Sequence, residues 1–208
     1  MISWNLLGIL LWVIVILYLV FIIQNIRKRR ITMIINQHKR FTWPNFILDI
    51  VEVLVLLLAA GYMFSRTFLD NPDLEDSNKI TSSVQYQPLV MKTGVDNSSY
   101  VTIDSRKKKI GTQTYTYYRA GNKVTVSSNA ATVVYGDKAM DISAEKIPYK
   151  ENELKQMDKK YQRAYVAVYT ARYKKNWQNG IGMHAGHIAT RYYLIRIPDP
   201  SFIKQNKK

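Results

Sequence analysis

The chain lacks cysteine and is poor in acidic residues. Its 208 residues contain no cysteine, which excludes disulfides and cysteine-ligated metal sites. Only 15 acidic residues stand against 30 basic ones, so the net charge is +15. A surplus of this size favours contact with an anionic partner such as nucleic acid, anionic lipid or an acidic polymer. The length allows about one domain together with membrane anchors.

Familiar catalytic motifs are also missing. No Gly-x-Ser-x-Gly elbow marks a serine as an activated nucleophile, and no glycine-rich phosphate-binding loop occurs. No pair of carboxylates stands out for sugar hydrolysis, because such pairs meet only in the folded protein. We therefore predict no catalytic residue and no cofactor. An envelope enzyme with an unrecognised site is kept as an alternative.

Two long apolar runs dominate the N-terminal third of the chain. The first, "WNLLGILLWVIVILYLVFII", covers Trp4–Ile23 without a charge, and its twenty helical residues would extend about 30 Å. The second covers Phe46–Phe64. A cleaved signal peptide would need basic residues before the first run and a small-residue cleavage site, and both are missing. The sequence predicts two transmembrane helices, residues 4–23 and 46–64, forming a hairpin over residues 1–69.

Charge around the two runs predicts their orientation. The connector, residues 24–45, carries six basic residues and no acid, whereas four acids follow the second run between residues 70 and 76. By the positive-inside rule the connector is cytoplasmic, and both termini and the whole region after Ser65 are extracytoplasmic. This is a multi-pass topology in a cell membrane, in contact with lipid. The connector itself fits either a short amphipathic helix on the inner leaflet or a flexible basic loop.

Asp49 and Glu52 lie inside the second apolar run. They are three residues apart and share one helix face. A carboxylate at mid-bilayer costs on the order of 3 kcal/mol, and less towards the interface. Three interpretations follow: pairing with Arg27–Arg30 at the interface, contact with the first helix or a partner subunit, or an ion route. Gln24 and Asn25 lie at the matching level of the first helix.

The region after the hairpin is predicted to be a linker followed by a mainly β domain. Residues 70–98 are polar and hold two prolines, so they read as a linker, with Val84–Val90 a candidate edge strand. Residues 99–204 form the domain, and residues 205–208 a basic tail. Four short strands are expected at Tyr100–Asp104, Thr112–Arg119, Lys123–Ser128 and Ala131–Gly136.

The remaining elements complete a membrane-anchored α+β fold class. Leu154, Met157 and Tyr161 recur at helical spacing and predict one short amphipathic helix. Residues 163–177 and 183–197 are expected as two longer strands, with a helix running to Gly180 as the alternative to the first. Strands this short and closely spaced predict a small barrel or sandwich.

His184 and His187 are the weak candidates for a metal site. Two histidines can begin one. Residues three apart lie on opposite faces of a strand, however, and no acid stands at a convincing spacing. We therefore predict no metal.

Two basic clusters are the candidate ligand-binding residues. The first is Arg106, Lys107, Lys108 and Lys109, and the second is Arg172, Lys174 and Lys175 beside Trp177. The region from Ser65 holds 24 basic and 13 acidic residues. Basic residues among aromatics can bind nucleic acid, but the extracytoplasmic location makes this partner unexpected. We expect electrostatic binding of an anionic cell-wall polymer or a protein partner, the alternative being a solvated basic surface without a specific ligand.

The run "RYKKNWQNGIGMHAGHIATRYYLIRIPDPSFIK", residues 172–204, and the two-span N-terminus resemble small uncharacterised two-span membrane proteins of lactic-acid bacteria. The resemblance implies a Gram-positive cell envelope and no assigned activity. The function expected is therefore that of a membrane-anchored envelope protein that displays a basic β-rich domain for binding. An accessory subunit that contacts a membrane partner, or itself, through the second span is the other alternative.

Overall fold

The computed structural model describes residues 3–37, 41–71, 73–93, 98–105 and 112–207. The chain divides into two compact units. The first, the helical unit, contains Met1–Asp73 and Tyr173–His187, and the second, the β-rich unit, contains Leu74–Arg172 and Ile188–Lys208. The predicted domain boundaries differ from this division, because the segment Tyr173–His187 returns from the β-rich sequence to the helices.

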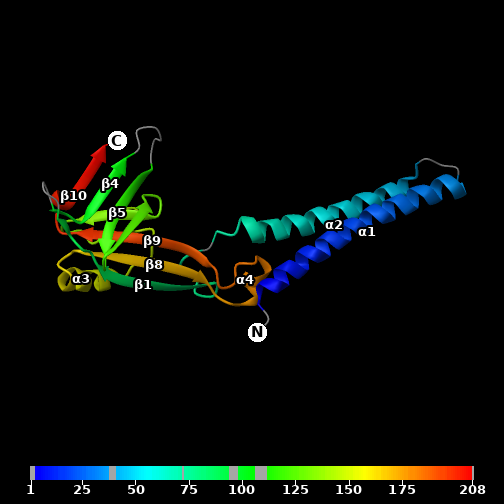
Figure 1. Ribbon diagram of the computed structural model, residues 1–208. Coiled ribbons are helices and arrows are strands. Elements are labelled where there is room, and N and C mark those ends of the chain that lie inside the picture. The colour runs from blue at the N-terminus through cyan, green and yellow to red at the C-terminus, as the bar shows by residue number, and fades with distance from the viewer. Residues whose placement is uncertain (1–2, 38–40, 72, 94–97, 106–111, 208) are drawn as a thin grey trace. The chain divides into compact units, whose positions relative to one another are not determined.

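Two long helices, α1 (Asn5–Gln37) and α2 (Trp43–Phe68), form most of the helical unit (Figure 1). By length and composition both are apolar enough to cross a membrane. Pro44 lies in the first turn of α2, where its missing N–H group costs no hydrogen bond. The prediction of two long apolar helices at the N-terminus is confirmed.

The first helix is longer than the sequence predicts. It does not stop near Ile23 but continues through the basic connector to Gln37, which gives it 33 residues and a length of about 50 Å. No glycine or proline interrupts residues 24–37, and Arg, Lys, Gln and Met are good helix formers. The loop interpretation of the connector is therefore wrong for residues 24–37.

The two helices pack side by side in opposite directions. Near one end the indole nitrogen of Trp12 donates to the hydroxyl of Thr67 at 3.2 Å. At the other end the hydroxyl of Thr42 contacts the sulfur of Met33 at 3.0 Å. These two contacts fix the register of the hairpin, so that any level on α1 can be matched to a level on α2.

The β-rich unit contains two four-stranded sheets, whose strand orders are β1-β8-β9-β7 (sheet A) and β10-β4-β5-β6 (sheet B). Sheet A consists of β1 (Ile80–Pro88), β7 (Ala131–Tyr135), β8 (Tyr165–Tyr173) and β9 (Ile188–Ile197). Sheet B consists of β4 (Val101–Ser105), β5 (Gln113–Arg119), β6 (Asn122–Ser127) and β10 (Ile203–Lys207). The described residues also form a short pair of strands, β2 (Lys92–Thr93) and β3 (Ser98–Ser99), and the 3-10 turn η1 (Pro200–Phe202).

The predicted mainly β region with few helices is confirmed. β4 to β7 fall within one or two residues of the four predicted short strands, and helix α3 (Glu151–Lys160) lies where Leu154 and Met157 indicated it. Of residues 163–178, whose state as strand or helix was open, Tyr165–Tyr173 form strand β8. The assignment to a small barrel or sandwich stays a prediction.

Two strands, β1 and β10, depart from the sequence expectations. β1 lies within the predicted linker as the edge strand of sheet A, longer than the candidate strand at Val84–Val90. β10 occupies most of the predicted tail and pairs in parallel with β4, with Gln205 opposite Ile103. Both strands end up at sheet edges, where partners are remote in sequence, so local pattern gives little signal for them.

The predicted second long strand begins late, because its first five residues form a turn. Met183 and Gly186 have left-handed backbone angles, with φ of 62° and 82°, which no extended strand allows. The glycine-rich "QNGIG" forms the short helix α4 (Trp177–Ile181) rather than a simple turn. The strand prediction is therefore wrong for residues 183–187, and β9 starts at Ile188.

Sheet A buries both of its faces over part of its length. One face packs against α3 and the loop before it, through a cluster that includes Tyr149, Leu154, Tyr165 and Tyr169. The other face packs against sheet B through Val166, Val168, Ile195, Ile197, Val101 and Tyr117. The second cluster covers only part of that face, and the uncovered part carries the groove described below.

Candidate functional site

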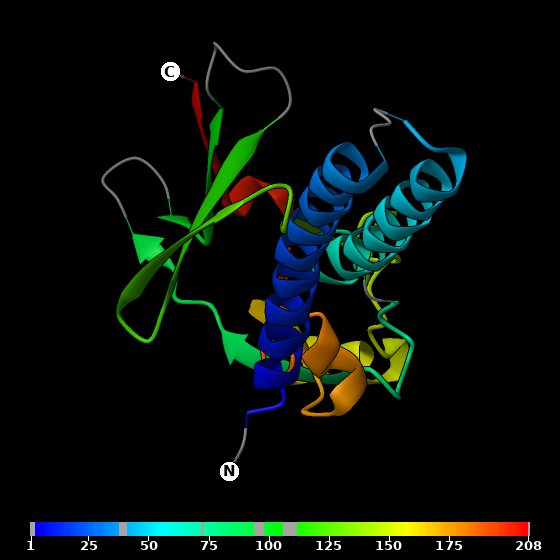
Figure 2. The same cartoon turned by 90° about the vertical axis from the view of Figure 1, so that its right-hand side faces the viewer.

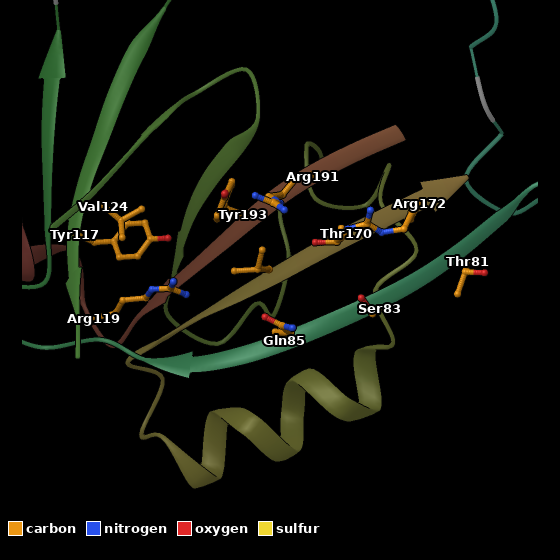
Figure 3. A pocket seen from close by; sticks show the side chains of 11 residues that line it. Thr81, Ser83, Gln85, Tyr117, Arg119, Val124, Thr170, Arg172, Arg191 and Tyr193 are labelled. Atoms are coloured by element: carbon orange, nitrogen blue, oxygen red, sulfur yellow. The ribbon is translucent and has the colours of Figure 1, made fainter. Parts of the chain in front are cut away.

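The groove lies on the uncovered face of sheet A, beside the β5–β6 hairpin, and has a volume of about 430 Å³ (Figure 3). It lies entirely within the β-rich unit. Its lining comes from β1, β5, β6, β8 and β9, and consists of Thr81, Ser83, Gln85, Tyr117, Arg119, Val124, Val168, Thr170, Arg172, Arg191 and Tyr193.

Strand alternation explains why this face changes from apolar to polar. Along β8 the side chains of this face are Val166, Val168, Thr170 and Arg172, since every second residue points the same way. The two valines pack in the cluster shared with sheet B, Val168 at the edge of the groove, and Thr170 and Arg172 continue the groove lining. β9 repeats the change, from buried Ile195 and Ile197 to Tyr193 and Arg191.

Of the described residues, three arginines and no acidic side chain line the groove. Arg191 on β9 is opposite Thr170 on β8, two residues from Arg172, so the strand pairing brings the two arginines of sheet A together. Arg119 comes from the end of β5, and Figure 3 shows its side chain extending from sheet B towards sheet A. Positive charge therefore converges from both sheets.

Hydroxyl groups complete the lining. Tyr117 is fully buried, and its hydroxyl has no hydrogen-bond partner among the described residues. Burial raises the pKa of Tyr117 to about 12, with Tyr193 adding to the effect and Arg119 opposing it. The hydroxyl therefore stays protonated at neutral pH and can donate a hydrogen bond. Thr170 and Ser83 add two further hydroxyls from sheet A.

This combination suits an anionic group. A guanidinium presents several N–H donors in a planar fork that matches the oxygens of carboxylate or phosphate. Neutral hydroxyl donors supply further hydrogen bonds without adding charge. Among the described lining residues, none carries a carboxylate that would favour a cationic ligand.

The structure separates the residues of the second predicted basic cluster. Arg172 lines the groove, whereas Lys174, Lys175 and Trp177 belong to the helical unit and are exposed. The first cluster, Arg106 to Lys109, lies outside the described residues. Arg119 and Arg191 were missed, although both lie in strands that the sequence predicts.

The two histidines do not form a metal site with other described residues, among which no group of three or more potential ligands converges. His184 stacks on Tyr173 with ring centroids 5.0 Å apart, and His187 is exposed. Burial first, and Asp70 second, raise the pKa of Tyr173 to about 12. The expectation that the histidines lie on opposite faces of a strand is wrong, because both precede β9.

Asp49 and Glu52 contact α1 of the same chain. Arg29 pairs with both acids, at 2.8 Å from Asp49 and 2.5 Å from Glu52. Asn25 donates a hydrogen bond to the second carboxylate oxygen of Glu52 at 2.8 Å. The carboxylates thus combine two of the three interpretations, arginine pairing and helix contact, within one hairpin.

Replacing Arg29 with Gln should weaken the helical hairpin. The change leaves two partly buried carboxylates facing each other without a cation, and hydrogen bonds to charged groups contribute about 1.5–3 kcal/mol each. We expect a lower thermal midpoint of the helical circular-dichroism signal in detergent. Lys28→Gln, an exposed neighbour, is the matched control and should leave the midpoint unchanged. A midpoint equally insensitive to both changes would show that the Arg29 cluster does not hold the hairpin.

Comparison with known proteins gives a family and no function. A protein-family model with the description ":-like" matches residues 3–204, which is nearly the whole chain. The chain belongs to this family, whose description names no activity, ligand or partner. No curated protein and no solved structure matches the chain.

Proposed function

We propose that the protein is anchored in a cell membrane by α1 and α2 and binds an anionic ligand in the groove of its β-rich unit, outside the cytoplasm. The observation that carries the proposal is the convergence of Arg119, Arg172 and Arg191 on a groove that no acidic side chain lines in the described part of the chain. The ligand class is a phosphate- or carboxylate-bearing polymer of the cell envelope, or an acidic segment of a protein partner. A Gram-positive envelope, where anionic wall polymers are abundant, is the setting we predict.

Polar side chains near both ends of the hairpin support the membrane anchor. Arg29, Asp49 and Glu52 mark one level, and Arg66 with Asp70, 3.7 Å apart, marks the other. The helix between Glu52 and Arg66 is about 20 Å long, and the apolar run of α1 is about 30 Å. With side chains reaching towards the headgroups, these lengths suit a bilayer core.

The position of Arg29 along the hairpin also explains why two carboxylates, Asp49 and Glu52, can occur within the apolar helix α2. In the hairpin register both acids of α2 lie beside Arg29 of α1. Arg29 belongs to the basic stretch that the positive-inside rule assigns to the cytoplasmic interface. There the carboxylates have an arginine and nearby water rather than lipid alone. The β-rich sequence follows α2 at its opposite end and so is extracytoplasmic in this topology.

The accessory-subunit alternative loses its specific support. It relied on Asp49 and Glu52 facing another protein, yet both acids contact Arg29 of the same chain. Binding through the groove is therefore the function that the geometry supports best.

Replacing Arg191 with Gln should weaken binding of the full-length protein in detergent to a short poly(glycerol phosphate), measured by titration calorimetry. A lost charged hydrogen bond costs about 1.5–3 kcal/mol, so we expect the Kd to rise roughly ten- to hundredfold. Arg191→Lys should recover only part of the affinity, because lysine keeps the positive charge but lacks the planar, forked N–H donors of the guanidinium group.

The matched control is Lys159→Gln on α3, an exposed lysine outside the groove. It removes the same charge and should change the Kd less than twofold or so, because exposed charges are screened beyond about 8 Å at physiological salt. Equal losses for Arg191→Gln and Lys159→Gln would mean that net charge, and not the groove, governs binding.

A further inference from the structure

The segment Tyr173–His187, which we call the α4 segment, runs from the last residue of β8 to the start of β9 and packs tightly on the helices of its own unit. A Cβ atom built on Gly8 would lie 2.6 Å from the carbonyl oxygens of Gly180 and Ile181. One built on Gly180 would overlap the carbonyl of Trp4. Glycine on both sides therefore lets the backbone of α4 approach α1 directly (Figure 2).

Polar contacts lock the α4 segment at one level of the hairpin. The Asn5 side chain accepts from the amide of Ala185 at 2.9 Å and donates to its carbonyl at 3.2 Å. Arg66 reaches the carbonyl of Gln178 at 3.5 Å. The segment is thus held between the first turn of α1 and the last turns of α2, level with the Arg66–Asp70 pair.

The α4 segment exposes two lysines and a tryptophan. Lys174 and Lys175 are exposed, and Trp177 is 55% exposed. Trp4, just before α1, and Leu6 in its first turn add apolar side chains that are 46% and 52% exposed. Exposed tryptophan beside apolar helix surface and lysine is the composition of protein at a membrane–water interface.

We propose that the α4 segment is a lipid-binding element, in which Lys174 and Lys175 hold the phosphates of anionic phospholipids while Trp177 enters the headgroup layer. The inference rests on the membrane anchoring proposed above and is independent of the groove. Under this proposal the ligand of Lys174, Lys175 and Trp177 is phospholipid of the outer leaflet and not a soluble polymer. The choice of lipid as the ligand follows from the contacts of the α4 segment with α1 and α2. A segment fixed to the outermost turns of a membrane-spanning helix lies at the height of the lipid headgroups.

Quenching of tryptophan fluorescence by brominated lipids tests this directly. The full-length protein is reconstituted with Trp177 as its single tryptophan, the other three replaced by Phe. The vesicles contain equal amounts of phosphatidylglycerol and phosphatidylcholine, with bromine on one lipid or the other. We expect stronger quenching by brominated phosphatidylglycerol, reflecting an enrichment of the anionic lipid of about fivefold for each lysine. Lys174→Gln with Lys175→Gln should abolish the preference.

A second protein, with Trp12 as its single tryptophan, reports on the apolar run of α1 and should be quenched equally by both lipids. Trp177 quenched equally by both, or not quenched while Trp12 is, would overturn the lipid-binding role and leave the anchor intact. Absence of quenching at Trp12 would overturn the anchor and this inference together. Neither result bears on polymer binding by the groove.

Discussion

Asp158→Ala should destabilise the β-rich unit by about 3–5 kcal/mol, the cost of leaving a buried charge without its partner. Arg196 is fully buried, and its guanidinium binds both carboxylate oxygens of Asp158, at 3.1 and 2.6 Å. It also donates to the carbonyls of Lys138 and Gly136, while Tyr165 donates to Asp158 at 2.9 Å. The network ties α3 to β8 and β9, two of the strands that line the groove.

Urea unfolding of the full-length protein in detergent, followed by near-ultraviolet circular dichroism, measures this loss. Asp137→Ala is the control: Asp137 also forms a close ion pair, 2.8 Å from Arg163, but its side chain is 95% exposed. Exposed pairs contribute about 0–1 kcal/mol. A loss below about 1 kcal/mol for Asp158→Ala as well would show that Arg196 reaches water or other acceptors, contrary to its burial.

Gly8→Ala should release the α4 segment from α1. The added methyl group meets two backbone oxygens at 2.6 Å, and neither can move without shifting α4 as a whole. Overpacking costs typically about 1–3 kcal/mol, and more where the backbone must move. We expect amide hydrogen exchange of residues 179–186 to accelerate at least about tenfold, most clearly at Ala185, whose amide binds Asn5.

Gly61→Ala is the matched control, since nothing lies within 4 Å of a Cβ atom built at Gly61 in α2. Alanine favours a helix over glycine by about 1 kcal/mol, so this variant should be as stable as the wild type or more so. Unchanged exchange in the α4 segment of Gly8→Ala would contradict the close contact of the two glycine-containing backbones.

Local pattern predicted much of this fold. The alternation of Thr with Tyr in "TQTYTYYR" and of Val with Thr in "KVTVSS" predicted β5 and β6, and the spacing of Leu154 and Met157 predicted α3. Each of these elements is specified by residues close in sequence. The loop interpretation of residues 24–37 was wrong because it relied on charge instead of on local helix propensity. The charges of these residues indicated a break from the membrane, but charge does not end a helix when the residues are good helix formers.

The candidate site was largely out of reach of the sequence. The groove forms only when β1 and β9, about a hundred residues apart, join one sheet. It also needs side chains of β5, which belongs to the other sheet, as part of its lining. Arg172 was singled out only because Lys174 and Lys175 follow it, and the fold then separated it from them. Arg119 and Arg191 stand alone among uncharged neighbours, so no cluster drew attention to them.

Retention of the full-length protein on purified Gram-positive cell walls tests the groove most directly. Two triple variants remove the same three charges: Arg119, Arg172 and Arg191 to Gln within the groove, and the exposed Lys138, Lys146 and Lys159 to Gln outside it. Our account predicts that the groove variant is lost from the walls at physiological salt while the control is retained like the wild type. Retention of the groove variant equal to that of the control would contradict it.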